Sequence, residues 1–150
     1  MCSSFKQELL NGSHALGTQA ANGVRTVTTK DVIKAALYLA TATKDSTTTV
    51  YNNTGELAGT GGYTQTGITV TNANLPGLTS TTAFWTPSAS LSWGGLTSSG
   101  SFDAVLFYND SSTSKLAISV HTFAAQSITS GTFTLTMPSN DSVNGLLRIT

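Results

Sequence analysis

The chain contains very few charged residues. Only 9% of its 150 residues are Asp, Glu, Lys or Arg, and seven cations balance seven anions, whereas about 25% of an average soluble domain is charged. The cations are scattered and form no basic stripe, so the sequence argues against binding to nucleic acid through phosphate neutralisation. A surface with so few charges suits a protein that remains bound to the surface of a partner.

Cysteine and histidine are also scarce, which excludes several kinds of site. Cys2 is the single cysteine, so there is no internal disulfide, and its position predicts a frayed end without a role. His14, in the expected arm, and His121 are far apart and the carboxylates are scattered, so we expect no metal site. The longest apolar run, 32–40, is interrupted by Lys34 and is too short to span a membrane.

No residue pattern points to an enzyme or a cofactor. The glycine-rich stretch 56–67 lacks the lysine and the following helix of a phosphate-binding loop, so its glycines are expected to serve a turn, with Tyr63 packed on the domain edge. No Gly-x-Ser-x-Gly motif occurs. Asp103 and Asp110 lie about 20 Å apart along one expected strand, too far for a glycosidase pair. We therefore expect no enzymatic activity and no cofactor.

Hydroxyl residues take the place of charges in this chain. There are 27 Thr and 19 Ser residues, and Thr favours strands because it is β-branched. Clusters of Gly, Ser, Asn and Pro, including an expected turn at Pro76-Gly77, separate apolar segments with strand-like patterns. These segments are 31–40, 67–72, 82–93, 101–110, 115–123, 131–138 and 145–150. They predict an all-β chain, folded as a single antiparallel β-sandwich or jelly roll.

The first strong strand and the N-terminal helix carry their own signals. In 31–40 the apolar residues recur with a period of two, although a helix is the alternative because Ala and Leu also favour helices. Near the N-terminus, Ser4 can cap a short helix, with Gln7 as the capping-box partner and Gly12 as the stop. A helix this short must dock on its own sheet or on a neighbouring subunit.

An extended arm or loop is expected to follow the helix. Residues 11–30 are small and polar with little periodicity, and a short strand over 24–28 is one option for their end. Few apolar residues anchor this arm, so we expect it to be disordered in the free protein. The expected organisation is a helix and arm over 1–30 and a β-sandwich domain over 31–150.

The aromatic residues leave two interpretations open. Trp85, Trp93, Tyr51 and Tyr63 could line a sugar-binding surface, which would require an exposed tryptophan. In the other interpretation, which we favour, the tryptophans fill the ends of the sandwich core.

Taken in order, the segments resemble a family of small structural proteins of tailed bacteriophages. The resemblance runs through "SFKQELLNG", "IKAALYLATAT", "TTTVYNNTGELAGTGGYTQTGITVTN", "FDAVLFYNDSSTSKLAISVHTF" and "SGTFTLTMPSNDSVNGLLRIT". Family members similarly run from a helix and an "IKVALY" strand to a "GTGYT" loop, then to "ALIYN", "GTFTITFP" and "LIRI" strands. The chain departs from the pattern in a longer arm over 17–30 and a loosely matching "FWTPSASLSWGG".

The resemblance implies a virion component without catalytic activity. We expect a decoration or cement protein on the capsid exterior, which contacts the major capsid protein and associates with itself as a dimer or trimer. A tail, neck or fibre component, perhaps one that binds carbohydrate, is the alternative, and a phage protein outside the virion is a third. The expected coat contacts lie in the helix and arm: Phe5, Leu9, Leu10, His14, Leu16, Val24, Arg25 and Val27.

Overall fold

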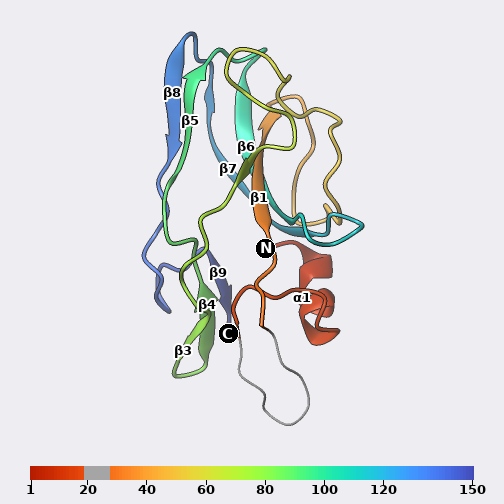
Figure 1. Ribbon diagram of the computed structural model, residues 1–150, viewed down its shortest axis with the longest axis vertical. Coiled ribbons are helices and arrows are strands. Elements are labelled where there is room, and N and C mark those ends of the chain that lie inside the picture. Colours follow the sequence, from red (N-terminus) through yellow and green to blue (C-terminus); the bar gives the residue numbers. More distant parts are fainter. Residues whose placement is uncertain (19–27) are drawn as a thin grey trace.

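The computed structural model describes residues 1–18 and 28–150 and is an all-β fold with one short helix, as predicted (Figure 1). The helix is α1 (Ser3–Leu10). The strands are β1 (Ile33–Leu39), β2 (Ile68–Thr69), β3 (Gly77–Thr79), β4 (Thr82–Trp85), β5 (Leu91–Leu96), β6 (Phe102–Asn109), β7 (Ala117–Gln126), β8 (Gly131–Leu135) and β9 (Leu147–Ile149). All strand pairs are antiparallel.

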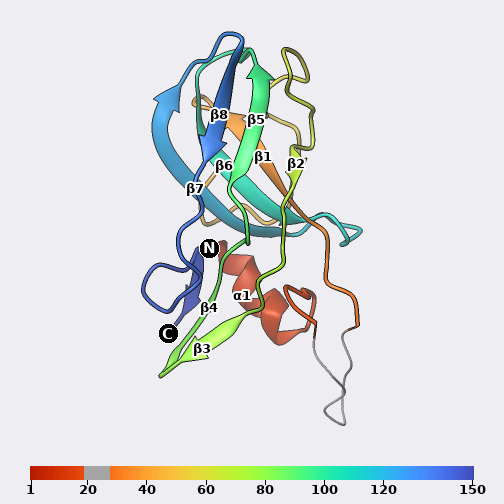
Figure 2. The same cartoon turned by 60° about the vertical axis from the view of Figure 1, so that its left-hand side comes forward.

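In the described residues the strands form a four-stranded sheet, β2-β1-β6-β7, a three-stranded sheet, β3-β4-β9, and the pair β5-β8. Figure 2 shows β5 and β8 lying across the four-stranded sheet in a sandwich-like arrangement. Aromatic side chains join these two layers. The ring of Phe133 on β8 lies 5.0 Å from that of Phe102 on β6 and 5.2 Å from that of Phe123 on β7.

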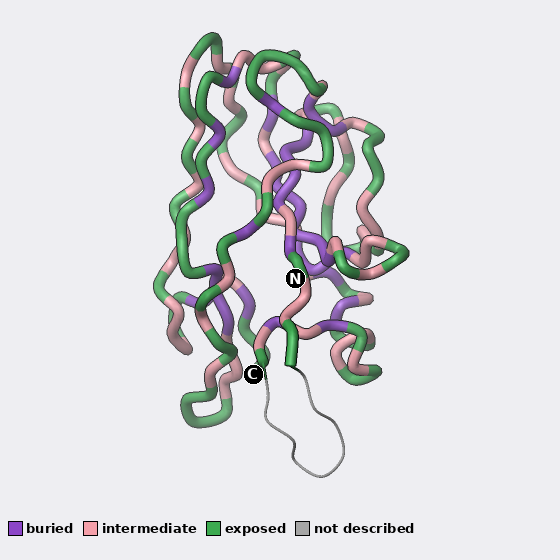
Figure 3. Tube along the Cα trace, in the orientation of Figure 1, coloured by how far each residue is buried: buried purple, intermediate pink, exposed green. Residues whose placement is uncertain are grey.

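The central strands β1 and β6 are buried more completely than simple alternation predicts. The expected inward residues of β1 are buried at Ile33, Ala35 and Leu37, but Ala36 and Tyr38 are fully buried as well. In β6 every residue except Asp103 is buried. Figure 3 shows this burial concentrated along the middle of the molecule. Residues 31–40 therefore form a strand, and the helix alternative is wrong.

The start of the chain differs from its prediction. Cys2, rather than Ser4, occupies the N-cap position of α1 without a side-chain cap, and the Ser4 hydroxyl is buried without a hydrogen-bond partner. Cys2 is fully buried, and its N–H donates to the Ile118 carbonyl of β7 at 2.9 Å, so the prediction of a frayed end is wrong. Gly12, with a φ of 68°, follows the helix end as predicted.

The predicted turn at Pro76-Gly77 is also wrong. Gly77 begins β3, and the turn to β4 lies at residues 80–81, where Ser80 has a φ of 53°. Gly77 belongs in the strand because it faces the Phe84 ring across the pair, and a Cβ atom there would lie 2.5 Å from that ring. The glycine makes room for an aromatic neighbour instead of a turn.

The glycine-rich stretch 56–67 turns the chain, as predicted. Gly61, Gly62 and Gly67 have φ angles of 56°, 80° and 70°, which side chains rarely allow. A Cβ atom at Gly62 would lie 2.5 Å from the Gly95 carbonyl oxygen, so the loop packs its backbone directly on β5. Tyr63 lies in the core rather than on an edge, with 3% of its surface exposed.

Candidate functional site

A groove lies at the end of the molecule that carries α1 and the three-stranded sheet, the lower end in Figure 1. Its volume is about 520 Å³. Helix α1 and residues 12–18 form one wall, and residues 75–76 with β4 and β9 form the other. The lining residues are Phe5, Leu9, Gly12, His14, Ala15, Leu16, Gly17, Thr18, Leu75, Pro76, Ala83, Phe84, Trp85, Leu147 and Ile149. We call this surface the apolar groove.

The sheet wall of the apolar groove presents an apolar face. Leu78 pairs with Ala83, and Ala83 with Ile149, so the three form one cross-strand row. Trp85 and Leu147 form the next row on the same face, because residues two apart in a strand point the same way. Trp85 is 2% exposed, whereas Ile149 is 43% and Leu78 is 70% exposed. This face therefore passes from buried floor to open surface.

The helix wall is held in place by Phe5. Phe5 is 1% exposed, and its ring centroid lies 4.7 Å from that of His14. Leu9 follows one turn later, on the same side of the helix, and also lines the apolar groove. Leu10 is next along the chain, does not line the groove and is 90% exposed.

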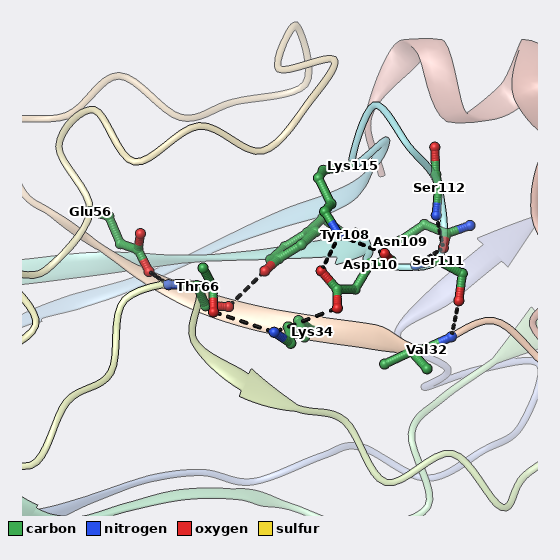
Figure 4. Close-up of polar contacts among 10 residues, drawn as sticks. All are labelled: Val32, Lys34, Glu56, Thr66, Tyr108, Asn109, Asp110, Ser111, Ser112 and Lys115. Atoms are coloured by element: carbon green, nitrogen blue, oxygen red, sulfur yellow. Dashed lines mark hydrogen bonds and ion pairs between the residues drawn. The ribbon is translucent and has the colours of Figure 1, made fainter.

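His14 is locked at the base of this wall. Its Nε2 lies 2.7 Å from Glu8 Oε2, and its Nδ1 lies 3.2 Å from Asn109 Nδ2. Figure 4 shows Asn109 with its Oδ1 accepting the backbone N–H groups of Ser111 and Ser112. The Asn109 amide nitrogen must therefore donate to His14 Nδ1, so His14 carries its proton on Nε2 and donates it to Glu8. Neither ring nitrogen is left for a metal or for proton transfer.

Asn72 joins the two walls of the apolar groove. Its Oδ1 accepts the Trp85 Nε1–H at 3.1 Å, and its Nδ2 donates to the Leu16 carbonyl at 2.8 Å. Ala15 is tied down as well, because its N–H donates to Asp31 Oδ2 at 2.7 Å and its carbonyl accepts the Asp31 N–H at 2.9 Å. Residues 14–16 of the expected arm are thus anchored to the body, contrary to the expectation that the whole arm is poorly anchored.

The structure brings several of the predicted contact residues together and leaves others unplaced. Those that line the apolar groove are Phe5, Leu9, His14 and Leu16. Val24, Arg25 and Val27 lie outside the described residues, as does the optional strand at 24–28 apart from its last residue. Sequence reasoning missed the sheet wall, because alternation in β4 and β9 marks an apolar face without telling what covers it.

A polar cluster lies within the glycine-rich stretch. Glu56 is 4% exposed, and its carboxylate accepts hydrogen bonds from Tyr51 at 2.6 Å, Tyr63 at 2.7 Å and the Thr66 N–H at 2.8 Å. The Tyr63 hydroxyl accepts the Leu37 N–H at 3.0 Å. Burial, followed by the charge of Glu56, raises the pKa of Tyr63 well above its ordinary value, so Tyr63 stays protonated as a donor. Glu56 is a structural acceptor, and sequence analysis missed it.

Two cations of β1 and the β6–β7 turn are paired with one carboxylate, as Figure 4 shows. Asp110 lies 2.7 Å from Lys115 Nζ and 3.5 Å from Lys34 Nζ. Partial burial acts to raise the pKa of Asp110, but the hydrogen bond from Lys115 and the charges of both lysines hold it below its ordinary value. Tyr108 donates to the Thr66 carbonyl at 2.7 Å beside them. These groups stabilise the fold and leave no basic site here.

The tryptophans belong to the core. Trp85 and Trp93 are each 2% exposed, so the exposure required by a sugar-stacking surface is absent at both. Trp93 packs against Phe133 at a centroid distance of 5.7 Å. The Tyr51 ring stacks on the Tyr108 ring at a centroid distance of 4.5 Å, so one of its faces is covered within the protein. The core interpretation of the two tryptophans is confirmed.

His121 lies in β7, half-buried beside a fully buried Ser119. Its Nε2 is 3.1 Å from Ser119 Oγ, and the edge of Phe107 meets it at a centroid distance of 5.7 Å. Burial, aided by the positive N-terminal amino group, lowers the pKa of His121 from its ordinary 6.5 to about 4. The folded protein therefore holds this ring neutral at pH values where the unfolded chain protonates it.

The low pKa of His121 predicts that part of the free energy of unfolding is lost in acid. This share is complete above pH 6.5 and is lost as the pH falls to 4, since only the unfolded chain gains the proton in that range. The loss is about 3 kcal/mol at most, at ~1.4 kcal/mol for each pKa unit. Urea unfolding at pH 7 and pH 4 should show a smaller loss in His121→Gln than in the parent. Equal losses in both proteins would contradict the prediction.

The part of the chain that the structure describes contains neither a metal-binding cluster nor a membrane-spanning helix. There, no three His, Cys, Asp or Glu side chains gather as a metal site would require. The one helix described is too short to cross a membrane. Comparison of the chain with protein-family models, curated protein sequences and solved structures finds no match.

Proposed function

We propose that the protein is a non-enzymatic virion component of a tailed bacteriophage, a decoration protein that binds the major capsid protein on the outside of the shell. The observation that carries the proposal is the gathering of exposed apolar side chains on the elements around the apolar groove. They are Leu75 before β3, Leu78 on β3 and Ile149 on β9. Exposed apolar surface of this kind marks interaction sites, because covering it releases water.

Two properties of the chain agree with such a role. The scarcity of charge, 9% of residues, removes like-charge repulsion between many copies packed on one shell. The sandwich-like sheets are compatible with a jelly roll, a topology that viral capsid domains use, and the proposal includes this topology. It also includes self-association as a dimer or trimer.

Copy number in the virion tests the proposal. The measurement is quantitative mass spectrometry of purified particles of the phage that encodes the chain, with the major capsid protein as reference. Hundreds of copies in a simple ratio to the coat are expected. A few to a few dozen copies would instead indicate a tail, neck or fibre component, and no copies would refute a virion role.

A surface variant tests whether the groove end makes the contact. Leu78 is 70% exposed, so Leu78→Asp should fold normally yet place a charge where the coat would bury an apolar side chain. We expect at least a tenfold loss of binding to capsids that lack the decoration protein, measured by co-sedimentation. Thr134→Asp, on exposed β8 far from the groove lining, is the matched control and should bind as the parent does. Equal binding by both variants would exclude this end as the contact.

A further inference from the structure

We infer that the apolar groove receives an uncharged segment of a partner polypeptide that inserts bulky apolar side chains and lies across the β3-β4-β9 sheet. The identity of that partner as a coat protein rests on the proposed function, but the chemistry of the segment follows from the groove itself.

The lining of the apolar groove excludes a charged occupant. None of its described lining residues is Asp, Glu, Lys or Arg. Two polar side chains of its lining are already bonded within the protein: His14 through both ring nitrogens, and Trp85 through Nε1 to Asn72. A charged side chain entering here would lose its hydration without gaining a partner, which costs several kcal/mol. Apolar side chains enter without that cost.

The extent of the apolar surface favours a polypeptide over a small molecule. A groove of about 520 Å³ could hold either. However, the row formed by Leu78, Ala83 and Ile149 continues the groove floor across three strands, about 10 Å, and ends in side chains 70% and 43% exposed. Leu75, which lines the groove on the same wall, is 53% exposed. An occupant several residues long would both fill the groove and cover this row, whereas a small molecule confined to the groove would leave Leu78 and Ile149 exposed.

The groove is also preformed, which lowers the entropic cost of binding. Asn72 spans from Trp85 on one wall to Leu16 on the other, and the paired bonds between Ala15 and Asp31 hold the same wall. The distance between the walls is therefore set before any partner arrives. The occupant must fit this width, so the groove selects for side-chain size as well as for neutrality.

Matched peptides test the inference on the full chain. The probe is a six-residue peptide of alternating Ser and Leu, acetylated and amidated, compared with versions in which the central Leu is Glu or Lys. Binding is followed by NMR at the Trp85 indole N–H and the groove methyl groups. We expect the neutral peptide to shift these signals and the charged ones to bind at least tenfold more weakly.

Two variants locate the binding. Ala83→Phe places a ring into the groove from its floor, and Leu78→Ser removes an exposed end of the row; both should weaken binding of the neutral peptide, whereas Thr134→Ser should not. No binding at millimolar peptide, equal binding of charged peptides, or shifts elsewhere on the protein would each overturn the inference. Peptide binding by a protein that is absent from the virion would refute only the proposed function. A protein that is present in the virion in hundreds of copies but binds no peptide would refute only the inference.

Discussion

Replacing Gly67 with alanine is expected to destabilise the protein by about 3 kcal/mol or more. Gly67 has a φ of 70°, and a Cβ atom there would lie 1.9 Å from the carbonyl oxygen of Ala35 on β1. That oxygen belongs to backbone at the centre of the fold and cannot move aside like a side chain. Relief would require β2 to separate from β1, with loss of the pairing between Ile68 and Ala35.

Substitutions at two other glycines distinguish the two causes of that loss, which are backbone strain at a positive φ and overlap of the new Cβ atom with β1. Gly95 has a φ of 66° but open space around its Cβ position, so Gly95→Ala isolates backbone strain, about 1 kcal/mol. Gly94 has neither positive φ nor a neighbour within 4 Å, and Gly94→Ala should change stability by less than about 0.5 kcal/mol. Urea unfolding should rank the variants in that order. A Gly67→Ala variant as stable as Gly94→Ala would contradict the close approach of the loop to β1.

Replacing Glu56 with alanine is expected to cost about 3–5 kcal/mol. The carboxylate is the common acceptor for Tyr51, Tyr63 and the Thr66 N–H, so its removal leaves buried donors without partners. The same change would loosen the contact of Tyr63 with β1, because the Tyr63 hydroxyl that donates to Glu56 also accepts the Leu37 N–H. Denaturant unfolding measures the loss, and hydrogen exchange at Leu37 should accelerate.

Smaller substitutions in this cluster provide the controls. Tyr51→Phe removes one donor and leaves the carboxylate with its other partners, so a loss of about 1–2 kcal/mol is expected. The double variant Tyr51→Phe with Glu56→Ala should lose less than the sum of the single losses, since the two groups share one hydrogen bond. Strict additivity would mean that the bond contributes nothing to stability.

Local patterns predicted the elements whose signal lies within a few residues. The apolar run of β6 and the alternating Thr and Phe of β8 specify strands by themselves, because side chains in a strand alternate between its faces. Gly12 predicted the helix end for a similar reason, as a left-handed residue suits glycine. The predicted helix start was wrong because the backbone of Cys2 is bonded to β7, far along the chain, and no local side chain caps the helix.

The apolar groove was beyond the reach of local patterns, whereas the partners of Glu56 lie 5, 7 and 10 residues from it but match no recognised motif. His14 bonds to Asn109, 95 positions away, and Trp85 lies opposite α1 across the groove. Leu78 and Trp85 are both apolar by residue type, yet one is 70% and the other 2% exposed. Their difference depends on which elements pack over each end of the sheet.

The amino-acid sequence by itself determined that this chain is all-β, poor in charge and turned by glycine at 56–67, since these follow from residue type and local spacing. Tertiary structure alone decided which apolar residues are core and which surround a groove, and which polar residues are buried. Burial of the Glu56 carboxylate is tolerable because the folded path of residues 51–66 turns three hydrogen-bond donors toward it. Those donors lie within ten residues of Glu56, but the cluster is buried against β1, where Leu37 donates its N–H to the Tyr63 hydroxyl from 26 positions away, and only the packed chain brings β1 there.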